Sequence, residues 1–454
     1  MKGQKLNKHQ TGLTSFIILW ISQSISELGS AMTSYALVLW AYQQKGTAMS
    51  TASMAFFSYL PYVLISFAAG TLADRWKKKN IMLVCDTIAA AGSGTIFLLL
   101  CTNSLQLWHL YLINLLIGCM NAFQQPASMV AVTLLTPKKY YSNVSGMQAM
   151  SASCVSILQP ALATALMAFG GIQTVLAADL ISFAVAFLTL AFLIHIPEIP
   201  TEIPEAPTEI PEASTVKKAK KEGFWQDSME GIRYLRKRRG IWKMILFFAL
   251  VNLLASMGGN ALMPALILSR TANNTKILGA VSACLGFGTL CGGLLATFAK
   301  LPGSRRKTIF WSCGISFLAC DVLWSVGRNQ TMWSLAAFLG NFPLPLLNAG
   351  MSSVMREQIP VEMQGRIFST QATFQFFTIP AGYLLGGILA DYIFEPWMAY
   401  SSPTQSRISL LVGSGKGSGI ALIFLLTGLT GFCINMAALK DRDYLELDRR
   451  PEES

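Results

Sequence analysis

One acidic side chain, Glu27, lies near the middle of the first long apolar stretch of the sequence, between Phe16 and Tyr42. No Lys, Arg or His accompanies it in that stretch. A carboxylate near the centre of a bilayer costs roughly 3 kcal/mol on insertion scales, so such a residue is expected to face a protein interior or a water-filled path. A carboxyl group there could carry protons. We therefore predict Glu27 to be a proton-coupling residue that alternates between protonated and ionised forms.

Three further polar residues share a helical face with Glu27. Gln23, Ser30 and Ser34 stand four residues before it, three after it and seven after it, so all four fall on one side of a helix. We expect this face to point toward a central space in the protein. The sequence must then supply the helices that surround that space.

The composition predicts those helices to lie in a membrane. Of 454 residues, 53% are hydrophobic and only 13% are charged, and the mean hydropathy is +0.47, which is far too apolar for a soluble domain of this length. About twelve stretches hold the roughly 20 apolar residues that a helix needs to cross a bilayer. They fall near residues 16–42, 51–73, 81–101, 108–135, 144–170, 172–195, 241–268, 278–299, 308–327, 332–354, 367–392 and 417–439.

The basic residues predict the orientation of the chain. If both termini are cytoplasmic, most of the 35 Lys and Arg fall on inner segments, as the positive-inside rule requires. We therefore expect a multi-pass protein of the cell membrane with both ends inside. The net charge of +12 is then a topology signal, and a nucleic-acid partner is not expected.

A biased segment divides the chain near its middle. Residues 201–207 (TEIPEAP) are nearly repeated by residues 208–214 (TEIPEAS), a composition that favours an extended spacer. Residues 224–239 then form a basic amphipathic pattern, which fits a helix at the inner membrane surface or one packed on the bundle ends. The predicted domains are therefore 1–196 (six-helix bundle), 197–240 (cytoplasmic linker), 241–439 (six-helix bundle) and 440–454 (cytoplasmic tail).

The two halves also carry similar landmarks. Pro126 and Pro345, like Pro160 and Pro380, recur at nearly the same offset along the chain. This recurrence indicates a duplicated six-helix unit. Many transporters have this architecture, with the substrate site between the repeats.

A loop motif follows the second apolar stretch. Residues 70–79 read GTLADRWKKK, which resembles the loop motif Gly-x-Leu-Ala-Asp-Arg-x-Gly-Arg-Lys of the major facilitator superfamily, with Lys77 in place of the second glycine and Lys78 in place of the arginine. Residues 121–127, 365–366, 395–396 and 413–419 are similar to stretches of the macrolide-efflux-like branch of its drug:proton antiporters. The fifth stretch departs from the antiporter pattern, because it carries Gln159-Pro160 rather than Gly-Pro.

This resemblance implies a fold and a gate. The implied fold is an all-α membrane protein of twelve transmembrane helices in two pseudo-symmetric six-helix bundles. The motif would act as a latch that holds the inner side shut, with Asp74 accepting hydrogen bonds from a helix amino terminus. The predicted gating residues are Gly70, Asp74, Arg75 and Lys79.

The resemblance also implies which helices line the central cavity, and polar residues on those helices are the predicted substrate-binding set. Each amide in the set could instead make an interhelical hydrogen bond. The set comprises Gln23, Glu27, Ser30, Asn121, Gln124, Gln148, Asn252, Asn348, Gln371 and Gln375. Asp86, Asp179 and Asp321 fall on helices that are peripheral in this fold, so structural or gating roles are expected for them, and Asp391 is expected near the outer gate.

The sequence thus predicts a secondary active exporter of amphipathic small molecules, such as drugs, macrolide-like compounds or natural products, coupled to protons by alternating access. The alternatives are a siderophore or lysophospholipid transporter of the same fold, or a membrane receptor that does not transport. Neither an enzyme, nor a metal site, nor an organic cofactor is predicted. The expected partners are a small-molecule substrate, protons and the lipid bilayer, with the chain acting as a monomer.

Overall fold

The computed structural model describes residues 2–137, 140–196, 238–298, 304–359, 373–400 and 402–448, together with Arg233, Arg236, Ile367 and Gln371. These residues form helices joined by short turns, and no strand occurs among them. Most of the predicted linker at 197–240 lies outside the described residues, so the domain boundaries remain a prediction.

The first half is built from long helices. Its helix α5 carries non-helical backbone angles at Gly170 and Gly171 and a positive φ of 74° at Gly171, a conformation that glycine adopts without steric cost. The chain turns there, so α5 contains the fifth and sixth predicted spans. The elements are α1 (Lys2–Lys45), α2 (Ala48–Arg75), α3 (Lys78–Cys101), α4 (Leu107–Leu135), α5 (Tyr141–Leu188) and the π-helical η2 (Thr189–Leu193).

The second half contains shorter pieces, because π-helical turns and prolines interrupt several spans. Its elements are α7 (Arg239–Arg270), α8 (Thr275–Phe298), α9 (Arg305–Phe317), η3 (Leu318–Val322), α10 (Leu323–Val326), α11 (Gln330–Asn341), α12 (Leu344–Gln358), α14 (Thr378–Ile388), η4 (Leu389–Phe394), α15 (Glu395–Ala399), α16 (Pro403–Val412), α17 (Ser418–Ala438) and η5 (Arg442–Asp448).

Where they are described, the predicted spans fall almost entirely on helix, which confirms the predicted fold class. Nine helices among the described residues are long and apolar enough to cross a membrane. That set counts the two arms of α5 once, and it leaves out α1 and the pair α11 and α12. Polar residues such as Gln23 and Glu27 lower the hydropathy of α1, while α11 and α12 are each too short alone. When α1, the second arm of α5 and the pair formed by α11 and α12 are added, the membrane helices of the described residues number twelve, as predicted. The surface helix α16 lies in a segment that the sequence predicts to be a loop.

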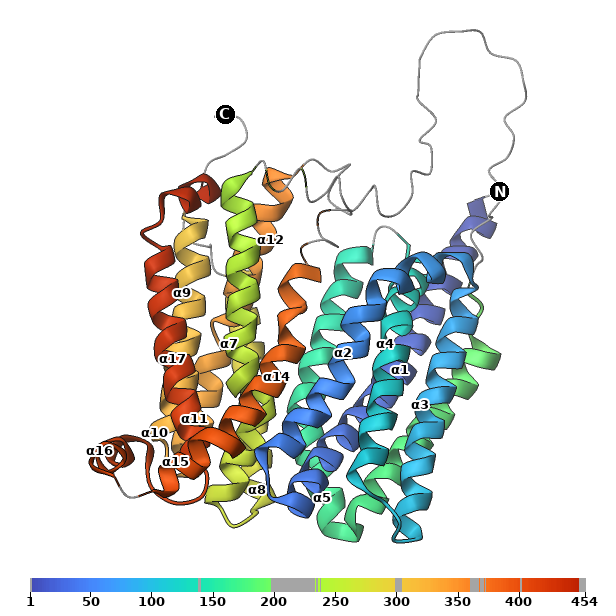
Figure 1. Cartoon of the computed structure of the whole chain (residues 1–454). Helices are drawn as coiled ribbons and strands as arrows, with labels where there is room; N and C mark the ends of the chain where they lie inside the picture. Colours follow the sequence, from blue (N-terminus) through green and yellow to red (C-terminus); the bar gives the residue numbers. More distant parts are fainter. Residues whose placement is uncertain are drawn as a thin grey trace.

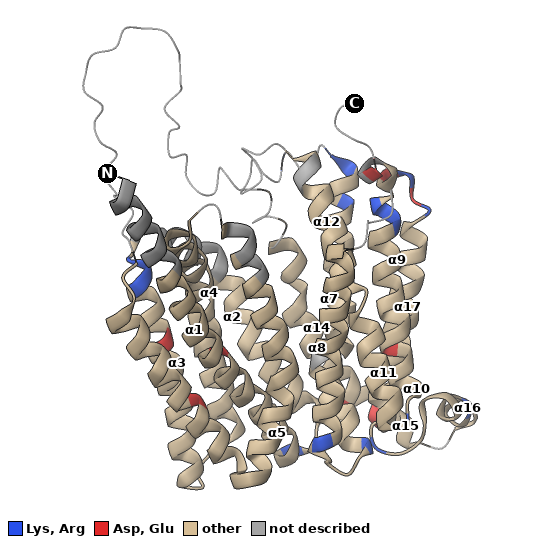
Figure 2. Cartoon of the chain, turned by 180° about the vertical axis from the view of Figure 1, so that it is seen from behind, with Lys and Arg blue, Asp and Glu red and all other residues tan. Residues whose placement is uncertain are grey.

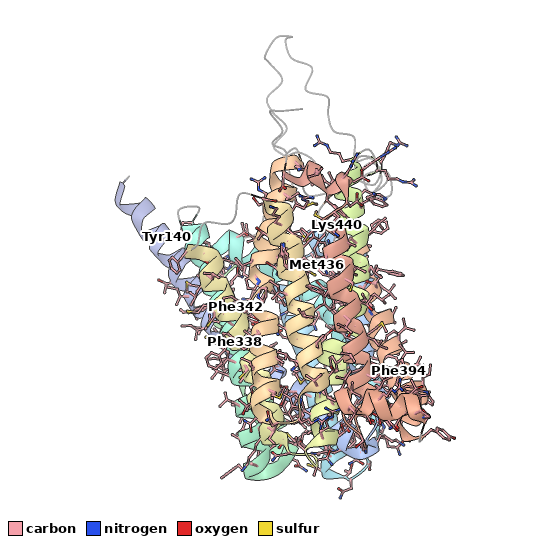
Figure 3. All side chains as sticks on the ribbon, turned by 90° about the vertical axis from the view of Figure 1, so that its left-hand side faces the viewer. Tyr140, Phe338, Phe342, Phe394, Met436 and Lys440 are labelled. Atoms are coloured by element: carbon pink, nitrogen blue, oxygen red, sulfur yellow. The ribbon has the colours of Figure 1, made fainter. Side chains whose placement is uncertain are left out.

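Both described chain ends lie at the same end of the bundle, as Figure 1 shows. We call this the terminal end and the opposite one the distal end. Tyr140 and Lys440 mark the terminal end in Figure 3, and Phe394 lies toward the distal end. The segment η5 packs at the terminal end, where Lys243 forms ion pairs with Asp441 and Asp443. The backbone N–H of Asp443 and the ammonium of Lys243 hold the pKa of Asp441 below its usual range.

The two halves contact each other through α2 with α14, α5 with α8 and α2 with α7. A hydrophobic cluster at the distal end joins Leu39, Tyr42 and Ala48 of the first half to Leu262, Leu266 and other buried residues of the second. In addition, the Thr51 hydroxyl donates to the Ala261 carbonyl at 2.8 Å. Nearer the middle of the bundle, the rings of Tyr59 and Tyr383 meet edge to face, with centroids 6.3 Å apart.

Candidate functional site

The face of α1 that carries Glu27 meets two acids within the first half, the half-buried Asp86 and the buried Asp179. The Gln23 amide donates to Asp86 on α3 at 3.5 Å, and the Ser30 hydroxyl donates to Asp179 on the second arm of α5 at 3.0 Å. Glu27 lies one helical turn from each of these contacts. Its side chain is exposed, and no hydrogen bond or ion pair joins it to another residue of the described part of the chain.

Asp86 ties three helices together. Besides Gln23 on α1, the amide of Gln124 on α4 donates to the Asp86 carboxylate at 2.8 Å. The structure therefore brings two predicted substrate-binding residues to one acid, where they act as interhelical donors. Their contact with substrate remains a prediction.

Asp179 also joins three helices through hydrogen bonds, nearer the distal end. Asp179 is only 3% exposed. One of its carboxylate oxygens accepts from the Ser30 hydroxyl on α1, and the other accepts from the Ser93 hydroxyl on α3 at 2.9 Å. A carboxylate away from water requires such donors. Figure 2 marks acidic residues in red part-way along the helices, where nearly all other residues are neither acidic nor basic and are drawn in tan.

A second group of predicted residues meets in the other half. The Asn252 amide of α7 donates to the Gln375 carbonyl at 2.9 Å, and the Gln371 amide donates to the Gln375 side-chain oxygen at 3.3 Å. Gln375 is 5% exposed. Three predicted residues thus come together here, just before the start of α14.

The remaining predicted binding residues are more accessible. Asn121 on α4, Gln148 on α5 and Asn348 on α12 all have exposed side chains. The structure gives no hydrogen bond that joins one of them to another member of the predicted set. Their amides are available to a ligand or to solvent.

The predicted latch is described only in part. Helix α2 continues through Arg75, but the side chains of Gly70, Asp74 and Arg75 lie outside the described residues. Lys79 is described, and its ammonium donates to the carbonyls of Ala191 and Ile194 at 2.8 Å each. In this conformation Lys79 therefore fixes the end of the sixth span to the start of α3.

A latch is fully described at the distal end, and it involves Asp391 of η4. Its carboxylate accepts from the backbone N–H groups of Ala48 at 3.0 Å and Met49 at 2.6 Å. These are the first residues of α2, whose own N-cap, Thr47, makes no side-chain cap hydrogen bond. An acid of the second half thus caps a helix of the first half, which suits the partial positive charge of a helix amino terminus.

A cavity of about 380 Å³ lies inside the second half. Asp321, Asn252, Asn341 and Asn348 line it together with aromatic and aliphatic side chains. Asp321 belongs to η3, and π-helical turns of this kind often occur at functional sites. The Asp321 carboxylate accepts from the Thr427 hydroxyl of α17 at 3.0 Å. The resemblance implies a peripheral position for this acid, and the sequence gives no signal of the cavity or the π turn.

The chain was compared with known proteins. The family model described as Major Facilitator Superfamily matches residues 19–382. Macrolide efflux protein A of Streptococcus pyogenes is 23% identical over 394 residues, which cover 86% of this chain and 92% of that protein. Macrolide efflux protein A of Enterococcus faecalis is 23% identical over 343 residues, covering 74% of this chain and 99% of that protein.

Solved structures share the fold at low identity. A bacterial homologue of the human lysosomal transporter Spinster, in an inward-facing and unoccupied conformation, superposes with a TM-score of 0.64 at 16% identity, covering 97% of this chain and 99% of that chain. The nucleoside transporter NupG superposes with a TM-score of 0.62 at 14% identity, covering 95% and 100%.

Proposed function

This chain belongs to the Major Facilitator Superfamily, and from that premise we propose that it is a secondary active exporter of amphipathic small molecules, coupled to protons by alternating access. We infer the substrate class from the names of its relatives, two of which are macrolide efflux proteins. We place it in the cell membrane with its terminal end in the cytoplasm. The basic residues of that end, which include Lys78, Lys79, Arg305 and Lys440, support this orientation through the positive-inside rule.

The observation that carries the proposal is the position of the contacts between the halves. The Asp391 cap on α2, the Thr51 to Ala261 hydrogen bond and the shared hydrophobic cluster all lie toward the distal end. When two repeats meet at one end, the substrate site between them is open to the other side of the membrane. Rocking of the repeats about this site then alternates the side to which it opens. Because these described contacts close the distal end, we assign the described conformation to the inward-facing state of that cycle.

Glu27 supplies the coupling in this proposal. Its neighbours Gln23 and Ser30 donate to other acids, so the described residues give Glu27 no donor that would hold it in the ionised form. It is therefore free to exchange its proton for a cationic or polar substrate group. Each proton that moves inward down a potential of 100 mV supplies about 2.3 kcal/mol for export.

The test is transport into proteoliposomes whose lumen is acidic. We expect the wild-type protein to accumulate a radiolabelled macrolide against its gradient and the Glu27→Gln variant to lose that accumulation. The amide matches the size of the acid but cannot release a proton, so folding and insertion are expected to be unchanged by size-exclusion chromatography. Glu395→Gln is the matched control, because its side-chain oxygen can still accept from the N–H groups of Gly419 and Ile420 at the start of α17.

The possible results separate the functions. Undiminished, gradient-dependent transport by Glu27→Gln would remove Glu27 from the mechanism. Ligand binding without accumulation by the wild-type protein would instead favour the receptor that does not transport.

A further inference from the structure

The cavity of the second half contains one acidic side chain. Among the residues that line it, only Asp321 is an Asp or Glu, and this residue is 6% exposed. One of its oxygens accepts from Thr427. The described residues provide no ion pair and no second hydrogen bond for this carboxylate. A buried carboxylate with so few donors favours any cation that enters beside it.

The amides around the cavity add further acceptors. The Asn252 NH2 group donates to the Gln375 carbonyl at 2.9 Å, and the Asn341 NH2 group donates to the Ala337 carbonyl at 3.0 Å. These bonds identify the nitrogen of each amide and leave its oxygen as the free acceptor. With Asp321, the cavity therefore presents oxygen atoms to a ligand, two of them on a carboxyl group whose ionised form a cationic ligand would favour.

The walls between these oxygens are mainly apolar. Phe248, Phe317, Trp324 and Tyr383 contribute aromatic rings, which accommodate the body of an organic molecule and attract a cation to their faces. Ala255 and Asn348 also line the cavity and have exposed side chains, so a ligand can reach it. A metal ion fits poorly, because the described residues contain no group of three His, Cys, Asp or Glu side chains placed to hold one.

We propose that this cavity is a binding site for organic amines, in which the ammonium group of an amphipathic ligand pairs with Asp321 and its apolar body packs on the surrounding rings. The proposal deepens the exporter function and rests on it, since the amine would be the recognised part of a transported substrate. The ammonium N–H groups donate to the free Asp321 oxygen and to the amide oxygens. The site is separate from Glu27, which belongs to the first half.

The test is a binding measurement in detergent, which is independent of transport. The probes are 2-(1-naphthyl)ethylamine, which is a cation at pH 7, and 2-(1-naphthyl)ethanol, which has the same shape and no charge. We expect the wild-type protein to bind the amine more tightly than the alcohol in isothermal titration calorimetry. In Asp321→Asn the amine should bind about tenfold more weakly or worse, since a charge-assisted hydrogen bond is lost, while the alcohol should bind equally to both proteins.

Two controls keep the result interpretable. Asp321→Asn retains an oxygen that can accept from Thr427, so thermal unfolding should show that the fold is preserved. Asp179→Asn changes a comparably buried acid in the other half, and it should leave the amine affinity unchanged. Equal amine affinity in wild-type and Asp321→Asn, an equal loss in Asp179→Asn, or no amine binding by the wild-type protein would each overturn the proposal. Failure of transport with intact amine binding would instead count against the exporter function alone.

Discussion

At the scale of single residues, acids inside the bundle fall into two kinds. Asp86 and Asp179 each accept hydrogen bonds from side chains on two other helices, so their role is to hold the first half together. Asp321 has one such donor and opens onto a cavity, and Glu27 has none among the described residues. The proposed roles follow this difference: acids with several donors are assigned a structural role, and the two with one donor or none are proposed to act in binding and proton transfer.

Removal of the Asp179 carboxylate tests the structural role. We expect Asp179→Ala to lower the free energy of unfolding by about 1–2 kcal/mol, because Ser30 and Ser93 both lose a buried acceptor. Thermal unfolding followed by tryptophan fluorescence would measure the change. Asp179→Asn keeps an oxygen at the same place and should cost less. If Asp179→Ala melted like the wild-type protein, these hydrogen bonds would not contribute to stability.

The sequence locates these acids but does not identify their partners. The spacing of Gln23, Glu27 and Ser30 correctly puts them on one face of a helix, since this depends only on helical geometry. Which neighbour that face meets depends on packing between residues far apart in the chain, such as Ser30 and Asp179. For the same reason, the distribution of polar residues predicted candidates such as Asn252 and Gln375 but not the hydrogen bond between them.

At the scale of helices, the α2 amino terminus connects the halves. Its first N–H groups have no cap from Thr47 and instead donate to Asp391 on η4. The predicted latch residue Asp74 lies toward the other end of the same helix, and it is predicted to accept hydrogen bonds from the amino terminus of another helix. Helix α2 therefore takes part in one capping contact that is described at the distal end and in another that is predicted at the terminal end. In the proposed cycle the two suit opposite states of the transporter.

Loss of the Asp391 cap should weaken distal closure. A helix cap is worth about 1 kcal/mol, so Asp391→Ala should raise the ratio of distally open to closed molecules roughly fivefold. Spin labels at positions 45 and 416, in a cysteine-free background, would measure the change by pulsed electron paramagnetic resonance. The fraction of molecules with the longer distance between the two labels should increase. These positions suit the measurement because Gly46 lies against the Lys416 ammonium.

Ser402→Ala is the control for that experiment. It removes the cap of α16, where Ser402 accepts from the Gln405 N–H at 3.1 Å, but this cap joins no residues of the first half. The spin-label distance should therefore stay as in the wild-type protein. An unchanged distance distribution in Asp391→Ala would show that the cap does not hold the distal end closed.

At the scale of the whole molecule, the halves are joined toward the distal end. The sequence predicted the spans because each must bury its backbone hydrogen bonds within an apolar helix of sufficient length. It could not predict which end is closed, since the alternating states of a transporter share all their helices and differ by only a few kcal/mol. The α5 turn at Gly170 and Gly171 was visible in the sequence, whereas the π-helical turns were not.

A covalent link at the distal end should arrest the cycle. Lys45 and Lys416 are exposed at this end, one in each half, and the Lys416 ammonium lies against Gly46, so cysteines at these two positions are placed to be joined by a short bis-maleimide. We expect the Lys45→Cys/Lys416→Cys variant, without its native cysteines, to lose transport in proteoliposomes after reaction with a bis-maleimide whose linker contains a disulfide, and to regain it on reduction. Each single variant should transport in both conditions. Full transport by the cross-linked double variant would exclude distal opening from the cycle.

The π-helical segment Leu318–Val322 sets the orientation of part of the ninth span. A π turn holds one residue more than an α turn, so it is equivalent to a single-residue insertion in a regular helix. Deleting one residue from it would restore regular winding and leave the two flanking helical pieces close to their present orientation, while residues inside the segment would shift by one position, which is roughly 100° around the helix axis. Chain length at this point therefore controls the direction in which the Asp321 carboxylate projects, and a deletion there could redirect the acid without changing any lining residue.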